Sequence, residues 1–276
     1  MFSLSECIPW MTVGLAESVA IVTLNICTII VFIRNRHLRK RSTYLVINLA
    51  VIDMFVGGVA VYMLFYTLGI FCNLWNWPST EVDMSIFLLR VFFTCGSLIN
   101  IAIIALERVH ATFRPFKHRV LKKWVYRLII AVVWVTSGLV TLAYTLLGEF
   151  DKAYYAVYLY PTFISICLLI ICISYASIVI KIRCGAQPQH HGATSRERKL
   201  TMTLLIVTVV SLLLYLPDVI AEYVLLISKF EIIVSFSVFC HLHSALLVLF
   251  YSNSLVISFI IRYPDARIQI SFTCIL

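Results

Sequence analysis

Long apolar stretches are the feature that most limits what this chain can fold into. They lie at 11–33, 44–69, 84–106, 125–147, 155–180, 201–227 and 234–261. A helix rises about 1.5 Å per residue, so each of these seven stretches is long enough to cross a bilayer. With 62% hydrophobic and 13% charged residues, a soluble domain of this size could not bury its apolar surface. The sequence therefore predicts an all-α membrane protein, a bundle of seven transmembrane helices.

The basic residues predict how these helices are oriented. Of the 22 Lys and Arg residues, 19 lie in 34–43, 108–127 and 181–199 or after residue 261, so every second connection is basic. Cytoplasmic loops carry an excess of Lys and Arg, which predicts an extracellular N-terminus and a cytoplasmic C-terminus. Membrane spans interrupt the charge, so the net charge of +9 reflects topology, and we expect membrane lipid but no nucleic acid as a partner.

The predicted division of the chain follows from this topology. We expect a short extracellular N-terminus over 1–10, a seven-span domain over 11–261 and a short cytoplasmic tail over 262–276.

Nine cysteines are present, and none has the spacing of a metal site. Cys7, Cys72 and Cys240 lie on or near the oxidising side, where three thiols allow at most one internal disulfide. We favour the pairing of Cys7 with Cys72.

Polar side chains inside the spans mark candidate functional positions, because ionisable groups in a membrane are costly. In chain order the polar ones are Asn25, Asp53, Ser97, Asn253 and Ser254, with Glu107 and Arg108 directly at the end of the third span; the spans also contain Trp134 and the helix-breaking Pro217.

Together these residues resemble the motifs of the rhodopsin-like (class A) G-protein-coupled receptors, from about residue 14 to residue 267. The matches are Asn25 in the first helix, Asp53 in the second, Arg108 of the Glu/Asp-Arg-Tyr motif in the third, Trp134 in the fourth, Tyr175 in the fifth, Pro217 in the sixth and Asn253-Ser254 in the seventh. The resemblance implies a multi-pass plasma-membrane receptor that has an extracellular ligand and a heterotrimeric G protein as partners and is not an enzyme.

The chain departs from the family pattern mainly in the seventh helix. Ile257 and Ser258 stand where the family has Asn-Pro, and Ile261 replaces the tyrosine of the same motif. A receptor-fold protein with weak or no coupling (a decoy, a dimer partner or a degenerate copy) therefore remains an alternative. A transporter is a distant one, because it predicts internal repeats or broken helices, and the sequence shows no similarity between its halves.

The resemblance implies a switch built from Glu107, Arg108, Tyr175 and Glu197. Glu197 lies twenty residues before Pro217, about 30 Å along a helix, and so at the cytoplasmic end of the sixth span. In the family, the arginine pairs with an acid there at rest, and activation moves the sixth helix outward. Arg108 alone also fits a simple anchor at the membrane edge.

A second implied site is a polar core. Asp53, Ser97, Asn253 and Ser254 carry oxygens at similar depth on three helices, with Asn25 close by in the first span. The family holds an allosteric sodium ion in such a cluster, and a hard cation prefers oxygen ligands. A hydrogen-bonded polar cluster with water is the alternative.

The expected ligand pocket contains Arg90, Tyr215, Asp218 and Glu222. Amine receptors of the family have an aspartate at the Arg90 position, so Arg90 disfavours an amine and favours an acidic small molecule or peptide, whose carboxylate or phosphate it would bind in a fork. An internal ion pair of Arg90 with Asp218 or Glu222 is the alternative. The seventh span has no lysine, so we expect no retinal. The outer half also resembles, loosely, that of melanocortin-type receptors.

Overall fold

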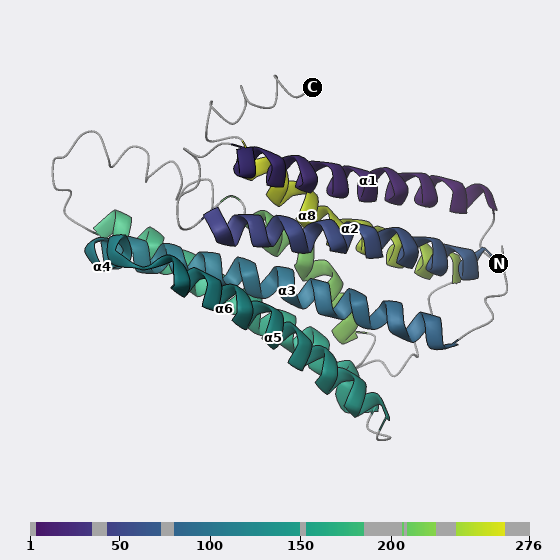
Figure 1. Ribbon diagram of the computed structural model, residues 1–276. Coiled ribbons are helices and arrows are strands. Elements are labelled where there is room, and N and C mark those ends of the chain that lie inside the picture. Colours follow the sequence, from purple (N-terminus) through teal and green to yellow (C-terminus); the bar gives the residue numbers. More distant parts are fainter. Residues whose placement is uncertain are drawn as a thin grey trace.

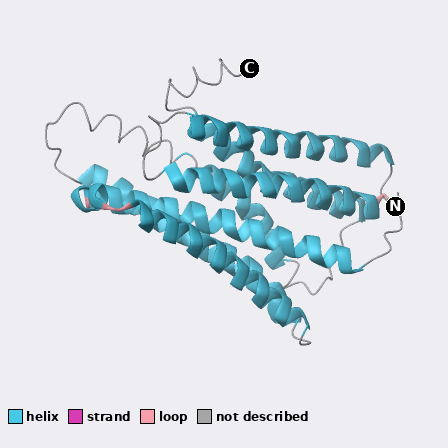
Figure 2. Ribbon diagram, in the orientation of Figure 1, coloured by secondary structure: helices cyan, strands magenta, loops and turns pink. Residues whose placement is uncertain are grey.

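The computed structural model of the chain is helical. It describes residues 4–34, 43–72, 80–149, 153–184, 206, 209–224 and 236–262, and within these ranges there is no strand (Figure 2). The helices are α1 (Leu4–Arg34), α2 (Thr43–Phe71), α3 (Thr80–Phe113), α4 (Pro115–Val120), α5 (Lys123–Glu149), α6 (Ala153–Cys184) and α8 (Phe236–Arg262). A further helix covers 209–224 and contains Pro217.

Six of these helices are long and apolar enough to cross a membrane, namely α1, α2, α3, α5, α6 and α8. The helix over 209–224 lies within the predicted sixth span. The all-α membrane class is therefore confirmed. The helices run past the predicted apolar stretches, since α1 begins at Leu4 and α3 continues to Phe113. A helix satisfies its own backbone hydrogen bonds, so it need not end where the apolar residues end.

The short helix α4 was not predicted from the sequence. It begins at Pro115 directly after α3 and ends at Val120. Proline favours the first position of a helix because its missing N–H has no intrahelical partner there. α4 therefore turns the chain between α3 and α5.

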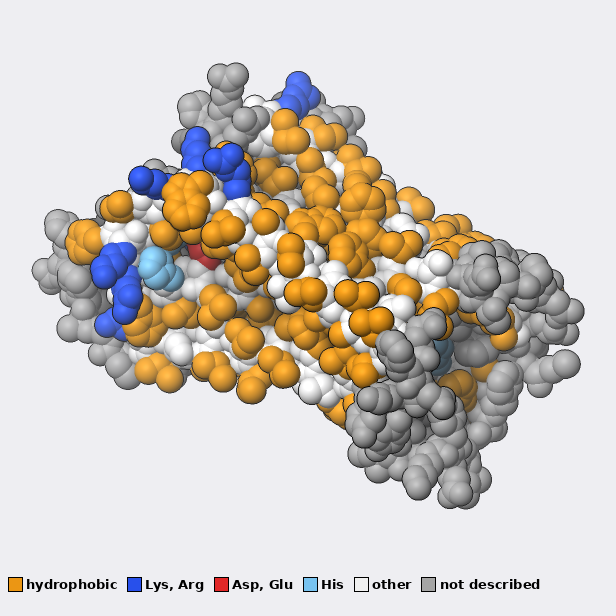
Figure 3. Space-filling view, turned by 60° about the horizontal axis from the view of Figure 1, so that its bottom comes forward, with side chains coloured by type: hydrophobic (Ala, Val, Ile, Leu, Met, Phe, Trp, Pro, Cys, Tyr) orange, Lys and Arg blue, Asp and Glu red, His pale blue; other side chains and the backbone are white. Residues whose placement is uncertain are grey.

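The helices pack into one bundle in which α3 contacts α2, α5 and α6, and α1 contacts α2 and α8 (Figure 1). Apolar side chains cover the middle of the face seen in Figure 3, and Lys and Arg side chains gather toward the end that carries α4. We call the end with Arg34, α4 and Lys181 the basic end, and the end with Cys7, Cys72 and Ser237 the opposite end. This separation matches a bundle surrounded by lipid, with one charged end.

Small residues bring α1 and α2 close together. A Cβ added at Gly57 of α2 would lie 2.9 Å from Ile21 Cγ2 and 3.0 Å from Val22 Cγ2, and one added at Gly14 of α1 would overlap Leu64. Close backbone approach at small residues is how membrane helices gain packing contacts without a hydrophobic driving force. α1 is thereby fixed on α2, which carries Asp53.

Candidate functional site

Glu107 organises the basic end of α3. Its side chain is only 6% exposed, and its Oε2 lies 2.9 Å from Arg108 Nε. Its Oε1 lies 2.7 Å from His118 Nε2 of α4 and accepts a hydrogen bond from Tyr126 Oη of α5 at 3.3 Å. The Glu107–Arg108 contact is an ion pair by distance, without hydrogen-bond geometry. The carboxylate therefore joins α3, α4 and α5.

Of the two other predicted switch residues, Tyr175 lies within the described part of the chain and Glu197 does not. Tyr175 of α6 is 5% exposed and packs in an apolar cluster with Tyr126, Ile171 and Ile178. Glu197 lies outside the described residues, so its pairing with Arg108 stays a prediction.

The polar core forms around Asp53, which is fully buried. Asp53 Oδ1 accepts hydrogen bonds from Ser97 Oγ of α3 at 2.7 Å and from Ser254 Oγ of α8 at 3.1 Å. Three helices therefore meet at one carboxylate, as the resemblance implied.

Two other members of the predicted core contact different groups. Asn253 Nδ2 donates to Tyr215 Oη of the helix over 209–224 at 2.9 Å. Asn25 Nδ2 donates to Ile21 O of its own helix at 2.9 Å. Asp53 Oδ2 and Asn253 Oδ1 are buried, and neither has a hydrogen-bond partner among the residues that the structure describes. Two oxygens thus remain for a further donor or a cation.

Trp134 fixes α5 to this region through a second polar cluster. Its Nε1 donates to Asn48 Oδ1 at 3.0 Å, and Asn48 Nδ2 donates to Asn100 Oδ1 at 3.2 Å. Asn100 Nδ2 in turn donates to Leu45 O at 2.9 Å. These hydrogen bonds link α5, α2 and α3 between Asp53 and the basic end. Asn100, which is fully buried, was not predicted from the sequence, although an amide inside an apolar span is itself a signal.

Arg90 lies on α3, eighteen residues before Arg108. Its Cζ lies 5.5 Å from the ring centroid of Phe250, a cation–π contact. Asp218, Glu222, Tyr160 and Tyr251 are close enough to interact with it electrostatically.

These charges are near one another without being paired. Among the described residues, no ion pair within 4.0 Å involves Arg90. Arg90 Nε and Asp218 Oδ2 are buried and lack a hydrogen-bond partner, while Tyr215 packs edge-on against Phe250 with the centroids 4.9 Å apart. The direct internal ion pair considered from the sequence is therefore absent from this part of the structure.

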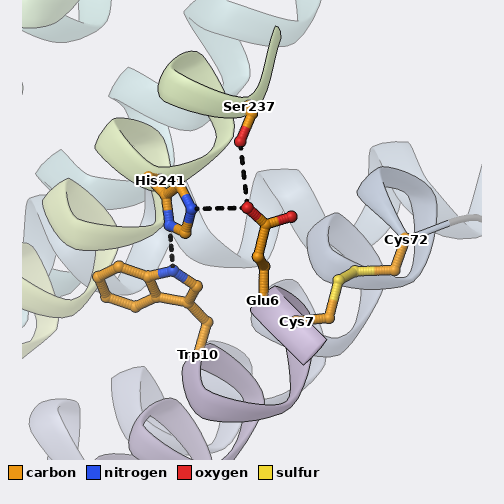
Figure 4. The surroundings of a disulfide bond; sticks show 6 residues. All are labelled: Glu6, Cys7, Trp10, Cys72, Ser237 and His241. Carbon is orange, nitrogen blue, oxygen red and sulfur yellow. Dashed lines mark hydrogen bonds and ion pairs between the residues drawn. A yellow bond between two sulfur atoms is a disulfide. The ribbon is translucent and has the colours of Figure 1, made fainter. Parts of the chain in front are cut away.

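A disulfide and a hydrogen-bond cluster close the opposite end (Figure 4). Cys7 of α1 is bonded to Cys72, which follows α2, and their Cα atoms are 6.4 Å apart; this is the pairing favoured from the sequence. Beside it, Trp10 Nε1 donates to His241 Nδ1 at 2.9 Å, and His241 Nε2 lies 3.4 Å from Glu6 Oε1. Because the indole donates to Nδ1, the neutral ring carries its proton on Nε2 and donates to Glu6. The cluster joins α1 to α8.

Glu17 is a further carboxylate inside a predicted span, and it was not among the residues predicted from the sequence. Its Oε1 accepts from Ser252 Oγ of α8 at 2.6 Å. The signal was present, because a carboxylate in the middle of an apolar span is rare. Glu17 adds another polar tie between α1 and α8.

Comparison with known proteins gives a consistent picture. The sequence model of the 7 transmembrane receptor (rhodopsin family) matches residues 24–260. The D(1B) dopamine receptor of Mus musculus is 28% identical over 141 residues, which is 47% of this chain and 27% of that protein. Rhodopsin of Galeus melastomus is 27% identical over 222 residues, 70% of this chain and 60% of that protein. The histamine H4 receptor of Rattus norvegicus is 27% identical over 124 residues, 44% of this chain and 30% of that protein. The matches therefore cover less than two thirds of the length of these relatives.

Proposed function

The chain belongs to the rhodopsin family of seven-transmembrane receptors, and from this premise we propose that it binds an extracellular ligand and activates a heterotrimeric G protein. Members of this family are multi-pass proteins of the plasma membrane and are receptors, not enzymes. The proposed orientation has the basic end in the cytoplasm, because 19 of the 22 Lys and Arg residues belong to connections on that side.

The observation that supports coupling best is the pair of buried Glu107 with half-buried Arg108. It stands at the basic end of α3, and α4 and α5 hold Glu107 through His118 and Tyr126. In the proposed resting state Arg108 also faces Glu197 on the sixth helix. Breaking that pair would release the sixth helix, which is a two-state rearrangement of the kind that opens a partner site.

The proposed G-protein contact surface borders this pair. It comprises the basic connection 114–127 and the segment 196–199. Within it, Phe116 of α4 is 82% exposed, and Arg114 and Lys117 are exposed beside it. An apolar side chain surrounded by bases would suit a partner surface with an acidic rim.

Arg90 supports an acidic ligand, either a small molecule or a peptide. Its guanidinium lies against Phe250 and has no ion-pair partner within 4.0 Å among the described residues, so a carboxylate or phosphate would supply direct acceptors for its N–H groups. The dopamine and histamine receptors among the relatives are named for amines; an ammonium group at this position would be repelled. Asp218 Oδ2 lies nearby and would accept a hydrogen bond from the same ligand.

A sodium ion is a proposed allosteric ligand of the polar core. The donor set fits a hard cation, because Asp53 Oδ2 and Asn253 Oδ1 are buried oxygens that have no hydrogen-bond partner within the described part of the chain. Ser97 and Ser254 would complete the set. When bound, the ion would supply positive charge that holds α2, α3 and α8 together. Ile257 replaces the asparagine of the family, so we expect the affinity for sodium to be reduced.

The second candidate function is a receptor fold with weak or no coupling, and the seventh-helix sequence favours it. Ile257, Ser258 and Ile261 remove the amide, the proline and the tyrosine that the family uses to stabilise its active arrangement. A decoy, a dimer partner or a degenerate copy would keep the pair of Arg108 with Glu197 but would not complete the movement of the sixth helix that opens the G-protein site.

The test is agonist-independent G-protein activation in cells that express the wild type, Arg108→Ala or Glu197→Ala. If the pair of Arg108 with Glu197 holds the sixth helix at rest, Glu197→Ala raises basal activation. Arg108→Ala changes basal activation in either direction, because Arg108 also belongs to the proposed coupling surface. The variant Ile257→Asn/Ser258→Pro then shows whether the seventh helix limits coupling. No change in any variant at normal surface expression would contradict the proposed switch.

Acidic small molecules and short peptides, screened against the wild type and Arg90→Ala, test the ligand class. We expect responses that depend on Arg90. Equal responses in both would rule out the anionic contact.

A further inference from the structure

Buried polar atoms without partners gather around Arg90. Within the described part of the chain, four of them have no hydrogen-bond partner: Arg90 Nε of α3, Tyr160 Oη of α6, Asp218 Oδ2 of the helix over 209–224 and Tyr251 Oη of α8. The last three side chains are only 4%, 7% and 4% exposed, and each is close enough to Arg90 to interact with it electrostatically. Buried polar groups are nearly always hydrogen-bonded. Several unsatisfied atoms on four helices therefore indicate that a molecule with matching polar groups binds between them.

The charges in this region do not balance. Glu222 lies four residues after Asp218, so the two carboxyl groups share one face of their helix, one turn apart. Glu222 is also close enough to Arg90 and Asp218 to interact with both. His243 of α8 lies near Arg90 as well, and Arg90 repels a positive charge on its ring, so His243 does not supply a second base. Among the described residues, the region thus has one base for two acids.

A ligand that carries only an acidic group would make this imbalance worse. Its carboxylate would occupy Arg90 and leave Asp218 and Glu222 with no positive partner, since neither carboxyl group has an ion pair within 4.0 Å among the described residues. A buried carboxylate without such a partner is costly, or it takes up a proton instead. A second, positive group on the ligand would remove this cost.

We propose that the ligand carries a cationic group as well as its acidic group. This inference rests on the proposed ligand site at Arg90. The carboxylate or phosphate of the ligand forms a forked ion pair with Arg90 and accepts hydrogen bonds from Tyr160 and Tyr251, whose hydroxyls can donate. Its ammonium or guanidinium lies at Asp218 and Glu222, where two acids outweigh the repulsion from Arg90. The ligand class is therefore a zwitterion, either a free amino acid or a peptide with one acidic and one basic side chain.

The experiment measures binding to the purified full-length chain in nanodiscs by titration calorimetry. Each free amino acid is compared with the acid that lacks its amino group and with the amine that lacks its carboxylate. Blocked tetrapeptides with one Glu and one Lys are compared with the same peptides in which Gln replaces Lys, and this second series separates a peptide ligand from a small molecule. We expect a zwitterionic probe to bind roughly tenfold or more tightly than its singly charged counterparts, the effect of one hydrogen bond to a charged group. If no zwitterion binds more tightly than its acid, the proposal is wrong.

Asp218→Asn tests the cationic half of the site, because it removes the charge and keeps the shape. The affinity for the zwitterion should fall by about tenfold, whereas the affinity for the acid should stay the same or rise, because a repelling carboxylate is gone. A purely structural role of Asp218 would change both affinities in the same direction and would contradict the proposal. Glu6→Gln is the matched control, since its carboxylate contacts His241 and Ser237 outside this region; both affinities should then equal those of the wild type.

Arg90→Ala separates a failure of this inference from a failure of the proposed ligand site. If Arg90→Ala weakens the binding of acids but Asp218→Asn weakens no probe, the acidic contact stands and the cationic one is refuted. If Arg90→Ala weakens nothing, the ligand site at Arg90 is itself refuted. The ligand-free chain provides a further measurement: Asp218→Asn should keep or raise the melting temperature, because Asp218 loses no internal countercharge. A lower melting temperature would show that Asp218 already has such a partner, and would overturn the proposal.

Discussion

At the residue scale, Glu107 is the side chain on which three helices of the basic end converge. Its carboxylate contacts Arg108 of its own helix, His118 of α4 and Tyr126 of α5. A buried carboxylate with several donors is stable only as long as the donors remain, because an unpaired buried charge is costly. Small changes at its partners should therefore be measurable.

The coupling of His118 to Glu107 can be measured by a double-mutant cycle. We expect His118→Ala to lower the free energy of unfolding by about 1 kcal/mol, and the effect to shrink by about 0.5 kcal/mol or more in a Glu107→Gln background. Thermal unfolding in detergent gives the four values. His110→Ala is the control, because its ring lies 5.9 Å from that of His118, tilted by 56°, without a described bond to Glu107. Additive His118 and Glu107 effects would refute the contact.

Trp134 offers a second residue-scale test. Trp134→Phe keeps the ring but loses the donor to Asn48 Oδ1, and polar contacts between membrane helices average about 0.6 kcal/mol. We expect the melting temperature to fall by about 1–2 °C, the shift that such a loss produces in a chain of this length. Trp124→Phe, on the same helix and 53% exposed, should change it much less; similar shifts for both would mean that the bond contributes nothing.

At the element scale, α1 is held by three different devices. Small residues fit it against α2, polar bonds from Trp10, Glu6 and Glu17 join it to α8, and the Cys7–Cys72 disulfide closes one end. No hydrophobic effect drives helices together inside lipid. Such specific contacts therefore decide how α1 is placed.

Adjacent glycines of α2 give a matched pair for the packing of α1. A Cβ at Gly57 would press on Ile21 and Val22, whereas one at Gly58 meets nothing within 4 Å. We expect Gly57→Ala to cost about 1–3 kcal/mol of stability and Gly58→Ala to gain roughly 0.5–1 kcal/mol from its better helix propensity. The melting temperatures of the two variants should move in opposite directions, and a shift in the same direction would show that α1 does not approach α2 at Gly57.

Removing either cysteine of the disulfide should destabilise the protein as much as removing both. It closes a loop of 65 residues between α1 and the end of α2, so its loss should cost about 2–4 kcal/mol. Cys7→Ser, Cys72→Ser and the double variant should lower the melting temperature by similar amounts. If the losses in the single variants add up in the double variant, the two cysteines are not bonded to each other.

At the scale of the whole molecule, the sequence predicted the class and most of the helices, because length and apolar composition decide whether a segment crosses a bilayer. The meeting of Asp53, Ser97 and Ser254 was also predicted, through the order of the family's motifs. The partners of Asn253, Glu107 and Arg90 were not. Tyr215, His118 and Phe250 reach them by side-chain directions and by the short helix α4, and neither is encoded in the spacing of residues along one helix.

The whole bundle therefore has the Glu107 cluster at the basic end, a polar core around Asp53 at its centre and a charged cluster around Arg90 toward the opposite end. These three sites lie along α3, which contacts α2, α4, α5 and α6. In the proposed receptor, ligand binding near Arg90 would change the arrangement of the polar core. That change would in turn weaken the proposed pair of Arg108 with Glu197. In this proposal, the seventh helix, in which Ile257, Ser258 and Ile261 replace the residues of the family motif, decides whether this coupling reaches a G protein.

Complex formation with a G protein tests that claim most directly. The purified chain in nanodiscs is incubated with nucleotide-free heterotrimeric G proteins of each major class, with and without excess guanine nucleotide, and the complex is measured by size-exclusion chromatography. We predict a complex with at least one class that dissociates when nucleotide is added and that is weakened by Arg108→Ala. If no nucleotide-sensitive complex forms with the well-folded wild type or with Ile257→Asn/Ser258→Pro, the account of the chain as a coupling receptor is contradicted.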